Sequence, residues 1–248
     1  MTSTTTTARP AVRAGNRAAD PFGGGIEMAL VALAATGIGF YRTFFSKPLS
    51  LDAAHLLHGV VSTAWLALVL VQALLIRSRR FKIHRTLGWA SLALFALLIV
   101  TSWQMVTLML SGATGLPFDW AKLFGLSDLL TLPLTIILYG GAILLRKDRY
   151  VHSRLLSATM LVIIVPAVAR MFNLVIPGMN GLVLAMHPTY LFVLAVLGVA
   201  IYSDWKNDRL RWPFPFAFAW LAATYAVLFP LWTSPAYDAL AKMIGGRA

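Results

Sequence analysis

Long apolar stretches constrain this chain more than any other feature. The stretches 56–76, 86–110 and 182–203 each exceed twenty residues and contain no Asp, Glu, Lys or Arg. A helix needs about twenty residues, at about 1.5 Å per residue, to cross a hydrocarbon core about 30 Å thick. Four weaker stretches are shorter, contain proline or carry a charge, which packed membrane helices tolerate: they are 26–41, 129–145, 155–176 and 212–232. The pattern predicts an all-α, polytopic transmembrane helix bundle of about seven spans.

Composition agrees with a membrane protein and sets the domain organisation. Of 248 residues, 59% are hydrophobic and 12% are charged, whereas soluble domains carry about 25% charged residues. Alternating ten-residue strands are absent, which argues against a barrel, and zero cysteines exclude disulfides and thiolate ligands. We expect residues 1–24 to form a disordered cytoplasmic tail, 25–235 the seven-helix domain and 236–248 a short outer tail.

The distribution of positive charge predicts the orientation. Fifteen of the 21 Lys and Arg residues fall in the N-terminal tail and beside every second loop, on one side of the predicted bundle. Short cytoplasmic loops carry this excess, so we expect the N-terminus inside and the C-terminus outside a bacterial inner membrane. The same residues would attract anionic lipids at the cytoplasmic face. The net charge of +12 is thereby explained without a nucleic-acid partner.

Five polar residues from different spans are predicted to reach the outer level of the membrane. His55 and His58 open one span three residues apart, and Asp128 opens another. Arg170 comes about sixteen residues, or about 24 Å, after the cytoplasmic start of its span, and His187 lies near the outer end of the next. We take His55, His58, Asp128 and His187 as candidate metal ligands and Arg170 as an anchor for an anion. The alternative is a structural polar network at head-group depth.

A second group of polar residues begins two spans on the cytoplasmic side. His84 starts a span in "HRTLGW", and His152 and Arg154 start another in "HSRLL". These residues are readily explained as helix starts that contact lipid. If the two imidazoles face each other, they could instead ligate haem axially. The candidate cofactor-binding residues are therefore His84, His152, Arg154 and Arg170.

The order of these motifs resembles a known pattern. It covers residues 55–172 and consists of "HG" (58–59), Trp65, Gln72, "HRTLG" (84–88), Asp128, "HSRL" (152–155) and Arg170. The pattern is similar to that of uncharacterised bacterial multi-pass membrane proteins with a domain of unknown function, which bring no established activity. Those relatives tend to read H-K-R-L, so Ser153 is a departure. A fainter likeness to cytochrome b561 and ferric-reductase membrane domains lies in the "HRTLGW" helix start.

The leading functional hypothesis is an integral membrane protein with a polar His/Asp/Arg site near its outer face. The site would bind haem b or a transition metal in a redox or cofactor-handling role, with a membrane redox partner or a quinone. The alternative is a non-enzymatic protein whose polar cluster is structural or binds lipid. A small-solute transporter is less favoured, because the two halves of the chain show no internal repeat and no charge lies at mid-depth.

Overall fold

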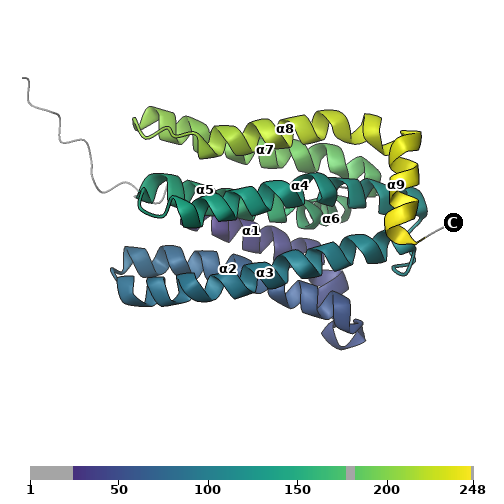
Figure 1. Ribbon diagram of the computed structural model, residues 1–248, viewed down its shortest axis with the longest axis horizontal. Helices are drawn as coiled ribbons and strands as arrows, with labels where there is room; N and C mark the ends of the chain where they lie inside the picture. The colour runs from purple at the N-terminus through teal and green to yellow at the C-terminus, as the bar shows by residue number, and fades with distance from the viewer. Residues whose placement is uncertain (1–24, 177–181, 247–248) are drawn as a thin grey trace, which may run out of the picture.

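The computed structural model describes residues 25–176 and 182–246, and within these ranges the regular structure is entirely helical (Figure 1). A π-helical turn, Tyr41–Phe45, and a 3₁₀ turn, Pro48–Ser50, connect the first two α-helices. The α-helices are α1 (Gly25–Phe40), α2 (Ala53–Arg77), α3 (Phe81–Ser111), α4 (Phe118–Leu144), α5 (Arg149–Ile163), α6 (Val165–Val175), α7 (Leu182–Lys206), α8 (Pro213–Trp232) and α9 (Pro235–Gly245).

The helices confirm the predicted transmembrane bundle. Six helices in the described ranges are long and apolar enough to cross a membrane, and the pair α5 and α6, bent by 46°, forms a seventh candidate. Pro166 explains the break in part, because it lies in the first turn of α6 and has no N–H to continue the α5 hydrogen-bond pattern. The protein is therefore an integral, multi-pass membrane protein, whereas its orientation in the membrane stays a prediction.

Antiparallel helix pairs build the bundle. In Figure 1, α2 lies beside α3, α4 beside α5, and α7 beside α8. The loops within these pairs, 78–80, 145–148 and 207–212, gather at one end, here called the basic end. Helix α9 lies across the opposite end, here called the α9 end. Helix α1 packs on α2, α5 and α6.

Residues 236–245, which lie in the segment expected to be a short outer tail, belong to α9, and this helix packs on the bundle. The Ser234 hydroxyl accepts a hydrogen bond from the Tyr237 N–H at 3.2 Å and caps the helix. The Tyr237 hydroxyl donates to the Lys122 carbonyl of α4 at 2.8 Å. The Lys122 ammonium in turn lies 2.9 Å from the Asp238 carboxylate. These contacts hold α9 over the ends of α3 and α4.

Replacing Gly39 by Ala is expected to destabilise the bundle, because α1 and α6 touch through backbone at this position. A Cβ at Gly39 would overlap the Ala167 carbonyl, whereas a Cβ at Gly37, two residues earlier, would meet nothing within 4 Å. We expect Gly39→Ala to cost about 1–3 kcal/mol of unfolding free energy and Gly37→Ala to be neutral or stabilising. Unfolding in mixed detergent micelles measures both variants, and equal stability of the two would contradict the close contact.

Docking of α9 is expected to weaken in acid. The hydrogen bond from Lys122 lowers the pKa of Asp238 below its ordinary value of 3.8. Asp238 therefore stabilises the docked helix fully above pH 3.8, and this contribution is lost as the pH falls through the lowered pKa. A spin label on Met243→Cys, unique because the chain has no cysteine, should become more mobile below that pH. In Asp238→Asn the label should show no such transition, and an identical pH profile in both proteins would refute the assignment.

Candidate functional site

The half of the bundle toward the α9 end encloses a cavity of about 470 Å³. This volume falls within the range of about 300–1,000 Å³ usual for small-molecule sites. Its walls come from α1 to α7 and from the π-helical turn after α1, and they are mostly apolar. The polar side chains that reach the cavity include His55, His58, Asp128 and Arg170. Four of the five residues assigned to the outer level from sequence thus line one cavity.

Helix α2 places two histidines on the cavity wall. Asp52 caps the helix, and its carboxylate accepts the backbone N–H groups of Ala54 and His55, the second of which lowers the pKa of Asp52. Its other oxygen lies 2.6 Å from the His55 Nδ1. The His58 ring lies 3.3 Å from the Thr101 hydroxyl of α3 and 3.4 Å from that of Ser62. Both imidazoles are therefore held in place by neighbouring side chains.

The glycine of the "HG" motif shapes the same wall. A Cβ at Gly59 would overlap the ring of Phe44, and both residues line the cavity. Phe44 belongs to the π-helical turn that follows α1. The glycine thus allows that aromatic turn to pack directly against α2, next to His58.

Arg170 and Asp128 bring opposite charges to the cavity without a direct ion pair. The Arg170 guanidinium donates to the Pro166 carbonyl at 3.0 Å and lies 4.6 Å from the Phe40 ring centroid, which is close enough for a cation–π contact. Asp128 on α4 is half-buried and lies within electrostatic range of Arg170. Within the described residues, its carboxylate accepts no hydrogen bond. Arg170 is therefore held in place by its neighbours, and both charged side chains line the cavity.

Three aromatic rings pack together next to the cavity, toward the basic end. The ring centroids of Trp65 and Phe95 lie 5.1 Å apart, those of Trp65 and Tyr139 lie 5.1 Å apart, and those of Phe95 and Tyr139 are 4.0 Å apart. All three rings are buried. They belong to α2, α3 and α4, and each lies within about one turn, along its own helix, of a wall residue: Leu66, Leu98 and Thr135, respectively. We call these rings the aromatic floor.

The remaining residue predicted for the outer site, His187, lies elsewhere. Its ring is exposed on α7, 2.9 Å from the Tyr225 hydroxyl and stacked at 4.3 Å on Phe229 of α8. Within the described ranges no group of three His, Asp or Glu side chains is placed to hold a metal ion. The metal set predicted from His55, His58, Asp128 and His187 is therefore not assembled, because depth along a helix does not fix the direction of a side chain.

The second predicted group, at the basic end, is partly brought together. The His84 and His152 rings, from α3 and α5, lie 6.4 Å apart and nearly perpendicular. Arg170 lies at the other end of the bundle, in the cavity. Arg154 forms an ion pair with another residue and does not join the two histidines.

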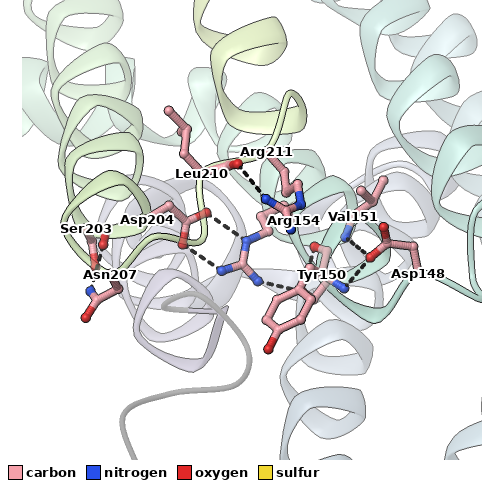
Figure 2. A network of polar contacts seen from close by, with 10 residues as sticks. Asp148, Tyr150, Val151, Arg154, Ser203, Asp204, Asn207, Leu210 and Arg211 are labelled. Atoms are coloured by element: carbon pink, nitrogen blue, oxygen red, sulfur yellow. Dashed lines mark hydrogen bonds and ion pairs between the residues drawn. The ribbon is translucent and has the colours of Figure 1, made fainter. Parts of the chain in front are cut away.

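That partner is Asp204 of α7, which the sequence did not single out (Figure 2). The Arg154 Nε and Nη2 atoms lie 2.7 and 2.6 Å from the two Asp204 oxygens. The side chains are 0% and 4% exposed. Because the fork of the guanidinium is occupied by this carboxylate, Arg154 serves as a bond between α5 and α7. The one signal in the sequence that could have identified Asp204 is its position as an acidic residue directly after an apolar span.

Comparison with protein-family models, with curated proteins and with solved structures finds no match for this chain. The function must therefore be argued from the geometry and chemistry of the cavity and of the polar clusters.

Removing one partner of the buried Arg154–Asp204 pair is expected to destabilise the protein strongly. Asp204→Ala leaves the guanidinium buried without compensation, which costs about 3–5 kcal/mol. The double substitution Arg154→Met with Asp204→Leu should recover most of that loss, because no charge stays buried. Thermal unfolding in detergent of Asp204→Ala, Arg154→Met and the double variant tests this expectation. A double variant as unstable as the singles would contradict the pairing.

Proposed function

We propose that the cavity binds a neutral, membrane-soluble molecule with an apolar body and a polar head group, of the isoprenoid quinone class. The observation that carries this proposal is that Arg170 and Asp128 both open into one apolar cavity without pairing directly. Charged groups within membrane spans usually mark a functional site. Here they supply a strong donor and a strong acceptor for a ligand.

The charge balance of the cavity favours a neutral head group. Arg170 and Asp128 compensate each other, so a neutral ligand adds no unpaired charge to an apolar site. The Arg170 N–H groups can donate to a quinone carbonyl, and Asp128 can accept from a quinol hydroxyl. His58 can do either, depending on its tautomer. The apolar side chains of α3, such as Leu98 and Met105, then offer contact to an isoprenoid chain.

This proposal retains the cofactor-handling role expected from sequence and gives it an organic ligand in place of haem or a metal ion. We replace the metal or haem by an organic ligand for two reasons. His187 lies outside the cavity, and the four ionisable residues that line it are two histidines and one pair of opposite charges. With the N-terminus inside, as the distribution of Lys and Arg predicts, the cavity would open toward the outer leaflet of a bacterial inner membrane. A quinone would reach it laterally from the bilayer.

Binding of decylubiquinone, a short-chain quinone, tests the proposal. We expect saturable binding at one site per chain, measured in detergent by equilibrium dialysis. Arg170→Leu should weaken binding at least about tenfold, because a charge-assisted hydrogen bond contributes about 1.5–3 kcal/mol. The matched control is Arg211→Leu, since Arg211 is exposed at the basic end. This control should bind as the unmodified protein does.

Two outcomes would overturn the proposal. One is unsaturable uptake of decylubiquinone by the unmodified protein, as for partition into the micelle. The other is equal affinity in Arg170→Leu and Arg211→Leu, once thermal unfolding has shown that both are folded. Stoichiometric phospholipid in the purified protein, without quinone binding, would assign the cavity to lipid instead.

A further inference from the structure

A second cluster of polar groups lies at the basic end, on the other side of the aromatic floor from the cavity. It consists of Gln72 on α2, His84 on α3 and His152 on α5. The two imidazole centroids are 6.4 Å apart, and the Gln72 amide nitrogen donates to the His84 carbonyl at 3.2 Å. The two imidazoles therefore lie side by side, and the Gln72 side chain contacts the backbone of the helical turn that carries His84.

Hydrogen bonding fixes the His152 ring. Its Nδ1 lies 2.7 Å from the carbonyl oxygen of Ala142 on α4, so Nδ1 carries the proton and donates it. The other nitrogen, Nε2, then keeps a lone pair. A backbone carbonyl that accepts from one imidazole nitrogen is the usual support for a histidine whose other nitrogen binds a metal.

The other two members of the cluster hold polar atoms that lack partners. The Oε1 of Gln72 and the Nδ1 of His84 are both buried without a hydrogen-bond partner. The Gln72 side chain is more than nine-tenths buried, and its nitrogen is already engaged with the His84 carbonyl. A buried polar atom that is left unpaired destabilises the protein. A ligand that accepts lone pairs would remove this destabilisation.

We propose that Gln72, His84 and His152 bind a divalent transition-metal cation of the Zn²⁺ class. Imidazole nitrogens and a carboxamide oxygen suit this class of ion, and a water molecule would complete a four-coordinate site. With metal–nitrogen bonds of about 2 Å, two imidazoles on one ion place their centroids about 5–6 Å apart. The observed 6.4 Å is slightly longer than that separation, so the two rings would move closer together when the ion binds. The site is independent of the quinone proposed for the cavity.

Bound to these residues, the ion would connect α2, α3 and α5 at the basic end. The three ligands are neutral, and Arg146 adds positive charge near His152, so the affinity should be moderate. A carboxylate at position 72 would add the missing negative charge. The variant Gln72→Glu should therefore bind the ion more tightly than the unmodified protein, an effect that misfolding cannot produce.

Zn²⁺ binding to the full chain, purified without a histidine tag and stripped with chelator, tests the site. We expect one Zn²⁺ per chain in competition with a chelating dye. Gln72→Glu should bind at least about tenfold more tightly, and His152→Phe at least about tenfold more weakly, the usual scale for changes at a metal site. Tetrahedral absorption bands of Co²⁺ in place of Zn²⁺ would report nitrogen and oxygen ligands directly.

Matched controls separate this cluster from the other histidines. The double variant His55→Ala with His58→Ala alters only the cavity, and His187→Ala alters only the α7 surface, so both should retain the Zn²⁺ affinity. Retained affinity in a folded His152→Phe protein would overturn the proposal, as would less than about 0.1 Zn²⁺ per chain in the unmodified protein. A Soret band in the purified protein would overturn it as well, because the two imidazoles would then hold haem.

Discussion

A charged side chain that is enclosed by apolar helices needs an oppositely charged or polar partner. In this bundle the buried ion pair between Arg154 and Asp204 is the interaction on which the helix arrangement depends. The Arg154 guanidinium is 0% exposed and pairs through two nitrogens with Asp204. Neither ion could stay buried alone, because desolvation costs several kcal/mol per ion. The pair therefore requires α5 and α7 to lie together at the basic end. Helices α4 and α8 pack on the same two helices.

The cavity, by contrast, lies in the half of the bundle toward α9. Arg170 meets the same physical requirement by another route, since it stacks on Phe40, donates to a backbone carbonyl and faces a cavity in place of a carboxylate. The Arg170 guanidinium is therefore held in place, but it is not neutralised by a direct ion pair. The contrast between two arginines of one bent span separates a structural ion pair from a candidate binding group. Burial alone would not separate them.

Hydropathy was sufficient to predict the fold, because the length and polarity of each span are properties of the sequence. Depth could also be counted along each helix, and it correctly grouped His58, Asp128 and Arg170. Rotation about the helix axis could not be counted. His187 has the right depth but points to Tyr225 on α8. For the same reason the Arg154–Asp204 pair was missed, since it joins residues fifty positions apart on helices whose adjacency the sequence does not state.

Helix α2 connects the cavity, the aromatic floor and the cluster at the basic end through one periodicity. His58, Trp65 and Gln72 are seven residues apart, and at about 3.6 residues per turn such positions fall on nearly the same face. That face points into the bundle along its whole length. His58 belongs to the cavity wall, Trp65 to the aromatic floor and Gln72 to the cluster at the basic end. The Asp52 cap fixes where the helix begins. A rotation of α2 about its axis would therefore displace all three side chains together. The seven-residue spacing thus couples the orientation of the cavity wall to that of the cluster at the basic end.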